Sequence, residues 1–337
     1  MPTREQLLAL MQKSNVPGMQ LVYTKGRRVT SYALGVRQDG AEPAVVETTI
    51  FEAASLGKAV QAYLTLRLVD QGVLTLDKPL LSYAPYPRLQ GVAGAGRITA
   101  RMVLAHTSGL PNWAANPLSP EWTTSSLRLK YAPDSCWNYS GEGYVLLQKT
   151  LEHLTGQSFE ALARREVFQP LRMTRSSFTW QPQWVANAAA GHDTSGKFSP
   201  INQFSPAYGA FSLLSTARDY SRFLQAIMMG HGLKPVTAHL LRTPASPALR
   251  CGQPVTPADA FVDWACGVGL ATTSRGLAQW QWGDNGNFKG LYFTLPDSRE
   301  SLVLLTNSAN GPKMTEELLK WFFGPGEYRA LQWLAEE

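Results

Sequence analysis

The sequence predicts an α+β fold, in which one antiparallel sheet is built from both ends of the chain and a mostly helical region is inserted between the two parts. Strand-like runs occur near the N-terminus and do not recur until the last part of the chain. Helical periodicity occupies the residues between them, interrupted by Pro- and Gly-rich loops. With 337 residues, 44% of them hydrophobic, the chain is long enough to bury a large core.

The N-terminal elements are predicted to be a helix and a hairpin. Thr3 and Gln6 have the spacing of a capping box, which predicts a short amphipathic helix through the leucines that follow. Residues 19–23 and 29–34 are strand-like. The basic turn between them, which starts at Lys25, predicts that these two strands form a hairpin.

The helical region and the second group of strands follow in that order. Helices are predicted at about 55–71, 99–106, 142–155, 158–166 and 216–229. Strands are predicted at 267–271, 277–282, 290–295 and 301–306, and a final helix at about 312–323. We therefore expect the terminal helices to flank the sheet.

The most informative motif is a serine and a lysine three residues apart at a helix start, Ser55 and Lys58. Positions i and i+3 of a helix share one face, so the Lys58 ammonium can reach the Ser55 hydroxyl. A desolvated lysine can take the proton of a serine hydroxyl, and the helix N-terminus favours the anion that forms beside it. The alternative is a capping serine followed by a solvated lysine.

Four further landmarks follow along the chain, in the segments 104–111, 137–144, 215–219 and 282–290. The ordered set resembles the serine β-lactamase-like (penicillin-binding-protein-like) family, which holds class C β-lactamases, DD-peptidases and family VIII-type esterases. The resemblance covers nearly the whole chain. His106, in the first of these segments, is expected to fix a helix-to-loop turn.

The resemblance implies a β-lactamase/transpeptidase-like fold that forms a single serine hydrolase domain over residues 1–337. Its α/β part comprises residues 1–54 and 262–337, and its mostly helical part comprises residues 55–261. The active site is expected in the cleft between the two parts.

The resemblance also implies catalytic roles for Ser55, Lys58 and Tyr139. Ser55 is the nucleophile that forms an acyl-enzyme, and Lys58 is the base in the free enzyme. Tyr139 shares proton handling with Lys58 and helps to protonate the leaving group, for which a neighbouring cation must lower the pKa of its phenol. The alternative for Tyr139 is a core aromatic residue whose hydroxyl bonds the backbone. We predict no cofactor and no metal.

The third motif of the family has a cation, then Thr or Ser, then Gly, on a strand that lines the cleft. When the neighbouring glycines are aligned, this motif falls on Asp284, Asn285 and Gly286. Gly286 keeps the small residue that lets substrate approach the strand. The backbone N–H groups of Ser55 and Asn287 are expected to form the oxyanion hole.

Two departures from the family put its usual substrates in question. Asp284 replaces the cation, and a carboxylate there repels a substrate carboxylate; Lys289 is either a compensating cation or a solvated turn lysine. Gly141 replaces an Asn whose amide contacts the substrate's acylamino group, and Glu142 is a substrate-binding candidate or an early helix residue. Trp113 lies in a loop that is either a pocket wall or an ordered segment pinned by its tryptophans.

Composition argues against several other classes. The net charge of +6 is dispersed, so we expect no nucleic-acid partner. The sequence contains no run of 18 apolar residues, so we expect no membrane span. The odd number of cysteines (Cys136, Cys251 and Cys266) lacks metal-ligand spacing, which predicts neither a disulfide framework nor a zinc site and makes Cys136 a buried thiol. Without a signal peptide the protein is cytoplasmic as written, or periplasmic or secreted if a leader was removed. The oligomeric state is not predicted.

Three function classes remain. The favoured one is a serine hydrolase that acts through an acyl-serine on small-molecule esters or amides, esterase-like, or an acyltransferase with the same intermediate. The second is a penicillin-recognising enzyme, either a β-lactamase or a DD-peptidase. The third is a non-catalytic relative that uses the cleft for binding, and the joint presence of Ser55, Lys58 and Tyr139 argues against it.

Overall fold

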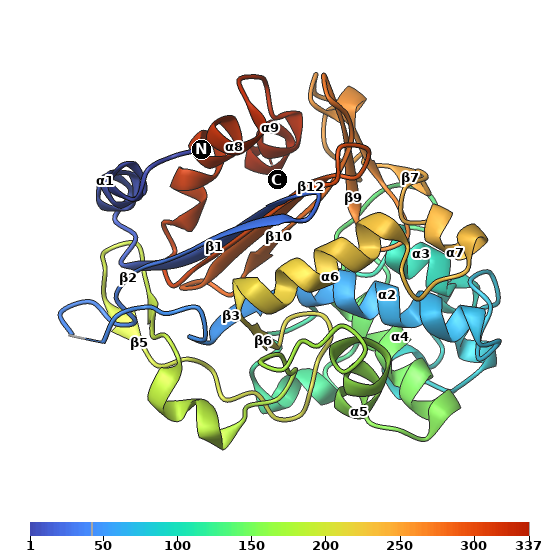
Figure 1. Cartoon of the computed structure of the whole chain (residues 1–337). Helices are drawn as coiled ribbons and strands as arrows, with labels where there is room; N and C mark the ends of the chain where they lie inside the picture. Colours follow the sequence, from blue (N-terminus) through green and yellow to red (C-terminus); the bar gives the residue numbers. More distant parts are fainter. Residues whose placement is uncertain (42, 337) are drawn as a thin grey trace.

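The centre of the molecule is an eight-stranded antiparallel sheet that joins the two ends of the chain (Figure 1). The computed structural model describes residues 1–41 and 43–336. In spatial order the strands are β2 (Arg28–Gly35), β1 (Gly18–Lys25), β12 (Glu300–Thr306), β11 (Lys289–Leu295), β10 (Gly276–Asp284), β9 (Gly269–Thr273), β8 (Val262–Trp264) and β7 (Ser246–Pro247). The N-terminal hairpin therefore pairs with the last strand, and the predicted fold class is confirmed.

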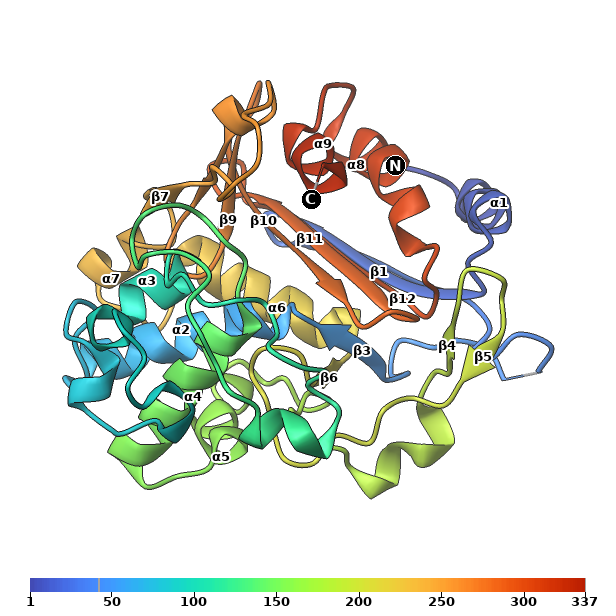
Figure 2. The same cartoon turned by 180° about the vertical axis from the view of Figure 1, so that it is seen from behind.

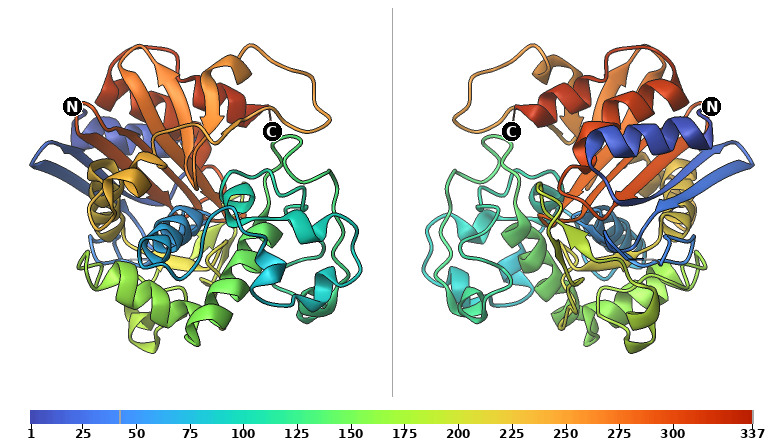
Figure 3. Two further views of the ribbon diagram at one scale, coloured as in Figure 1. Left: turned by 90° about the vertical axis from the view of Figure 1, so that its right-hand side faces the viewer. Right: turned by 90° about the vertical axis from the view of Figure 1, so that its left-hand side faces the viewer.

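Helices cover both faces of this sheet. The helices are α1 (Arg4–Ser14), α2 (Gly57–Asp70), α3 (Ala100–Leu104), α4 (Gly141–Thr155), α5 (Phe159–Ala163), α6 (Ala217–Met229), α7 (Pro235–His239), α8 (Thr315–Phe323) and α9 (Arg329–Ala335). Figures 1 and 2 show α1, α8 and α9 on one face, and α6 with the helical region on the other. The same layering is visible from the side in Figure 3.

Short elements connect these layers. Two small sheets pair β3 (Phe51–Ala54) with β6 (Leu213–Ser215), and β4 (Gly191–His192) with β5 (Phe198–Ser199). The capping box that the sequence predicts is present, since Thr3 and Gln6 exchange both of its hydrogen bonds at the start of α1. The sequence predictions did not include α7, α9 or the short strands.

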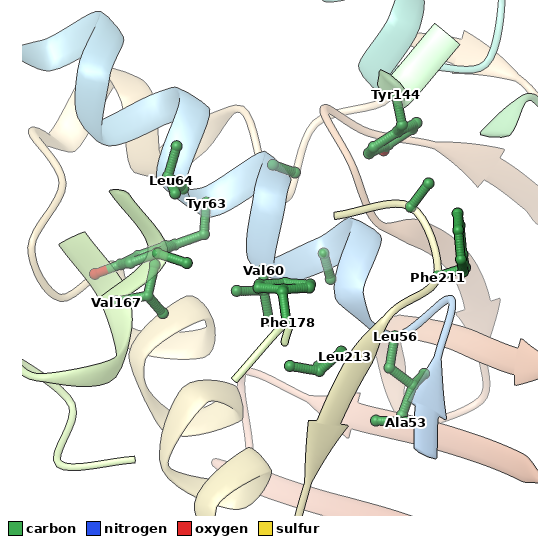
Figure 4. Packing of buried hydrophobic residues seen from close by; sticks show 14 of the residues in the cluster. Ala53, Leu56, Val60, Tyr63, Leu64, Tyr144, Val167, Phe178, Phe211 and Leu213 are labelled. Atoms are coloured by element: carbon green, nitrogen blue, oxygen red, sulfur yellow. The ribbon is translucent and has the colours of Figure 1, made fainter. Parts of the chain in front are cut away.

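The helix α2 runs through the core of the helical region, and this burial fixes the position of its first turn. Leu56 and Val60 are fully buried and pack near Phe178 and Leu213 (Figure 4). A Cβ atom on Gly57 would lie 2.6 Å from the Gly209 carbonyl oxygen, so only glycine permits this close approach. The start of α2 is thus held tightly against its surroundings.

A disulfide joins Cys136 to Cys251, with 5.3 Å between their Cα atoms. The prediction of no disulfide, with Cys136 as a buried thiol, is therefore wrong. The two cysteines are separated by 115 residues, so only the fold brings them together. Cys266 is a buried free thiol, and burial raises its pKa to about 11.

Within the described part of the chain, no helix has both the length and the apolar character needed to cross a membrane.

Candidate active site

Ser55 lies on a sharp turn between β3 and α2. The strand ends at Ala54, whose φ of 49° lies in the left-handed region that non-glycine residues seldom adopt. Such a residue costs on the order of 1–3 kcal/mol and persists only where its surroundings fix it. Here β6 pairs with β3, and the missing side chain of Gly283 lets β10 approach, since a Cβ atom there would lie 2.5 Å from the Ala53 carbonyl oxygen.

Lys58 follows one turn later and reaches back to the serine. Its ammonium donates to Ser55 Oγ at 3.2 Å and to the Ala210 carbonyl oxygen at 2.7 Å, and its side chain is fully buried. The contact expected from the i, i+3 spacing is present. The alternative of a capping serine and a solvated lysine is wrong, because Leu56 occupies the N-cap of α2 and makes no side-chain cap bond.

Tyr139 lies beside the same ammonium, immediately before α4. The Lys58 Nζ atom is 4.7 Å from the centre of the Tyr139 ring. That ring is held between two others: its centroid is 4.4 Å from that of His106 and 5.0 Å from that of Trp282. Tyr139 and Ser55 line the same cavity, so the structure brings together all three residues that the sequence indicates as catalytic.

His106 stacks on the ring of Tyr139. It ends the turn after α3 with a φ of 58°, and its Nδ1 accepts the Ser140 N–H at 3.1 Å. Burial, and then the neighbouring Lys58 charge, hold the pKa of this imidazole well below its ordinary value. His106 is therefore neutral near pH 7 with its proton on Nε2. This is the turn-fixing role that the sequence indicates, with a second role in stacking on Tyr139.

Glu142 does not line the cavity, where the sequence predicts it as a substrate contact. Its side chain is fully buried, and its carboxylate accepts from Arg88 at 2.6 Å, from the Ala114 N–H at 3.0 Å and from the Trp122 indole at 2.7 Å. The substrate-binding prediction is wrong, because these three donors draw the carboxylate under the loop and away from the cavity. Glu142 anchors the loop that carries Trp113.

Trp113 lines the cavity, as predicted for a pocket wall. Its ring lies over the start of α4, where a Cβ atom on Gly141 would be 2.3 Å from the indole. The place that an Asn side chain takes in the family is thus filled by an aromatic ring. Aromatic contacts with Trp122 and Phe211 fix the indole, at 5.7 and 5.4 Å between ring centroids.

Asp284 and Lys289 face each other across the end of the β10–β11 hairpin and form an ion pair. Both line the cavity, and Asp284 also accepts the Gly286 N–H at 2.7 Å. The Lys289 side chain is only 18% exposed, so it is the compensating cation and not a solvated turn lysine. The Asp284 carboxylate therefore has a counter-ion on the same cavity wall.

The Asn285 side chain is bound to a buried carboxylate that sequence reasoning missed. Its amide donates to Glu52 at 2.6 Å, and Asn202 donates to the same carboxylate through its backbone and side-chain N–H groups. Burial raises the pKa of Glu52, and these donors oppose that shift. Glu52 is three residues before Ser55, so its place in the same motif is the signal that pointed to it. Gly286 lines the cavity beside Asn285.

Asn287 does not match its predicted role in the oxyanion hole. Its backbone N–H donates to the Asn285 carbonyl at 3.1 Å, and its side chain bonds Ser199. The reason is that β10 ends at Asp284, so the next residues form a tight turn and not a continued strand. The role of the Ser55 N–H group in the oxyanion hole stays a prediction.

The cavity measures about 840 Å³ and contains Ser55 in its wall. Its aromatic and aliphatic lining comes from several segments and includes Trp113 of the loop, Phe211 just before β6, Trp282 of β10 and Leu334 of α9. Among the residues that the structure describes, no three His, Cys, Asp or Glu side chains gather as a metal site.

Comparison with known proteins identifies the family of the chain and related folds. The β-lactamase family model matches residues 4–320. The chain is 26% identical to penicillin-binding protein 4 of Amycolatopsis lactamdurans, over 95% of this chain and 88% of that protein, and 28% identical to esterase EstB of Burkholderia gladioli, over 68% and 70%. The β-lactamase/D-alanine carboxypeptidase of Pseudomonas syringae has the same fold, with a TM-score of 0.79 at 18% identity over 95% of this chain and 97% of that one.

Proposed function

The chain belongs to the β-lactamase family, and on that premise we propose that it is a serine hydrolase that cleaves small-molecule esters or amides through an acyl-serine. The observation that carries the proposal is the 3.2 Å contact between Lys58 Nζ and Ser55 Oγ, at the wall of a cavity that Tyr139 also lines. A serine needs an adjacent base to become a nucleophile, and Lys58 is the group in reach.

In the proposed reaction, Lys58 acts in its neutral amine form, and Ser55 Oγ attacks the substrate carbonyl carbon while its proton passes to Lys58 Nζ. The Ser55 N–H stabilises the negative oxygen that develops. Tyr139, beside Lys58, passes a proton to the leaving oxygen as the bond between the carbonyl carbon and the alkoxy oxygen breaks, and Lys58 returns the Ser55 proton to Tyr139. Water then attacks the carbonyl carbon of the acyl-serine and gives its proton to Lys58 or Tyr139. Ser55 Oγ takes up a proton as its bond to the acyl group breaks, which releases the acid and restores Ser55.

An ester preference follows from two features of the substrate-facing wall. The Asp284–Lys289 ion pair offers no uncompensated cation to a substrate carboxylate. The Trp113 ring replaces an amide that would bind an acylamino group, and presents an apolar face. A neutral ester with a simple acyl group needs neither of the missing contacts.

The second candidate is a penicillin-recognising enzyme, and Lys289 is the observation that favours it. This ammonium lines the cavity and would bind a substrate carboxylate if Asp284 released it. The names of relatives include both a penicillin-binding protein and an esterase, so they support either candidate. Substrate preference therefore decides between the two.

The test compares p-nitrophenyl acetate or butyrate with penicillins and cephalosporins as substrates of the wild type. We expect hydrolysis of the esters and weak or no hydrolysis of the β-lactams. Lys58→Ala and Tyr139→Phe should each lower kcat by roughly 10²–10⁴. Rapid acylation by penicillin without ester hydrolysis would establish the second candidate instead.

Asp284→Asn sharpens this comparison because it removes the counter-ion of Lys289. It should raise the rate of acylation by an anionic penicillin about tenfold or more, the effect of a restored charge contact. The double variant Asp284→Asn/Lys289→Gln is the control and should lose that gain. An equal gain in the double variant would show that the Lys289 charge is not responsible.

A further inference from the structure

The cavity extends from Ser55 onto the sheet face that α8 and α9 cover. Three neighbouring strands contribute two cross-strand rows to this face, because residues two apart in a strand point to the same side. The outer row is polar and contains Asp284, Lys289 and Thr306. The inner row is apolar and contains Trp282, Leu291 and Leu304. All six residues line the cavity.

The C-terminal helices form the opposite wall of this apolar chamber. Leu331 and Leu334 of α9 line it together with Pro312, which lies just before α8. Figures 1 and 2 show α9 beside α8 over the sheet. The chamber therefore has an apolar floor and a polar edge, and its wall is apolar at α9 and polar at α8, which contributes Thr315 and Glu316.

Trp333 holds α9 in place, so this wall is a fixed part of the structure. Its ring is fully buried, with its centroid 4.9 Å from that of Trp137 and 5.8 Å from that of Trp280. Its indole N–H donates to Asp259 at 2.9 Å. A helix of only seven residues is marginal by itself, and these contacts stabilise it.

The chamber adjoins Tyr139. Trp282, in its floor, contacts the Tyr139 ring at 5.0 Å between centroids, and Tyr139 is the proposed proton donor to the leaving oxygen. Trp113 and Phe211 line the same cavity and contact each other, with 5.4 Å between their ring centroids. An alcohol that leaves past Tyr139 thus has the Trp282–Leu291–Leu304 row directly beside it.

We propose that this chamber binds the apolar alcohol portion of an ester substrate, an alkyl chain of several carbons. The assignment rests on the proposed function and specifies its substrate class. In the first step the carbonyl carbon bonds to Ser55 Oγ, its bond to the alkoxy oxygen breaks, and the alcohol leaves with the proton that Tyr139 donates. Each added CH₂ group that is buried against the apolar row should raise the rate of this step about fourfold.

The experiment measures kcat/KM for ethyl, butyl and hexyl acetate, which share one acyl group and differ only in the alcohol. Hexyl acetate has four more CH₂ groups than ethyl acetate, so the wild type should prefer it by on the order of 10²-fold. Leu334→Trp narrows the chamber and should bring this ratio closer to one, and Leu331→Gln should lower it. Gln332→Trp is the matched control: the residue is exposed on the same helix, outside the cavity lining, and its ratio should equal that of the wild type.

The outcomes separate this assignment from the proposed function. Hydrolysis of all three acetates at similar rates by the wild type overturns the chamber assignment and leaves the serine hydrolase standing. The same holds if Leu334→Trp flattens a p-nitrophenyl series from acetate to hexanoate but not the alcohol series, because the chamber then receives the acyl chain. No hydrolysis of any ester, with no adduct on Ser55, overturns both.

Discussion

The indole ring of Trp113 lies over Gly141 so closely that a Cβ atom at position 141 would be 2.3 Å from it. The loop that carries Trp113 is tied to the same helix start by three further contacts, since Asn112 accepts from the Gly141 N–H at 3.0 Å and from the Glu142 N–H at 3.0 Å, and Glu142 binds Ala114. Loss of the motif's amide and gain of the aromatic wall are therefore one structural change.

Gly141→Asn should lower ester kcat/KM by about tenfold or more, because the indole must leave the cavity wall and displacement of a positioned group is costly. The double variant Trp113→Ala/Gly141→Asn removes the clash, so its kcat/KM for acylamino substrates should exceed that of Gly141→Asn. Steady-state kinetics with both substrate types provide the measurement. Undiminished activity of Gly141→Asn would contradict the assigned role of Trp113.

Gly283→Ala should reduce activity strongly while the protein stays folded. Its Cβ would lie 2.5 Å from the Ala53 carbonyl oxygen, so β10 must move away from the Ser55 turn. Gly96→Ala is the matched control, because a Cβ there has no heavy atom within 4 Å. Ester kinetics and circular dichroism of both variants test this. Equal activity of the two would mean that the approach of β10 does not matter.

Glu142→Ala should destabilise the protein by about 3–5 kcal/mol, because it leaves the Arg88 guanidinium buried without its partner. Asp77→Ala breaks an exposed pair with Arg101 and should cost about 1 kcal/mol or less. Urea unfolding of both variants gives the free energies. Similar small losses in the two would show that the Glu142 pair is not structurally important.

His106 should make the protein sensitive to acid. The folded pKa of this imidazole lies below its ordinary value of 6.5, so the unfolded chain takes up a proton that the folded chain refuses. Its contribution to stability is complete above pH 6.5 and falls below it by up to about 1.4 kcal/mol per pH unit. His106→Asn keeps a residue that tolerates positive φ and should have a flatter dependence. Unfolding free energies at pH 7.5 and 5.5 measure this, and parallel profiles would contradict it.

Contacts within one helical turn were predictable from the sequence, and contacts between distant segments were not. The Ser55–Lys58 contact was predicted from the i, i+3 spacing, and it is present although Ser55 lies just before the N-cap of α2. The Cys136–Cys251 pair depends on tertiary structure that no local pattern encodes. The Asp284–Lys289 pair is intermediate, because it requires the register of the β10–β11 hairpin as well as its existence.

The C-terminal helix α9 was missed for a related physical reason. It has only seven residues, and its stability comes from Trp333 packed among other tryptophans and not from its own periodicity. Glu142 was misplaced because its position at a helix start does not reveal Arg88, which lies 54 residues earlier in the chain. The prediction for Asn287 assumed that the strand continues to this residue, but the chain turns there.

The central claim is that Ser55 becomes acylated, and one measurement tests it most directly: the intact mass after a fluorophosphonate, for wild type and for folded Ser55→Ala. The account predicts a single added phosphonyl group on the wild type, located on Ser55 by peptide mapping, and no addition to Ser55→Ala. Labelling of folded Ser55→Ala at the wild-type rate would contradict it.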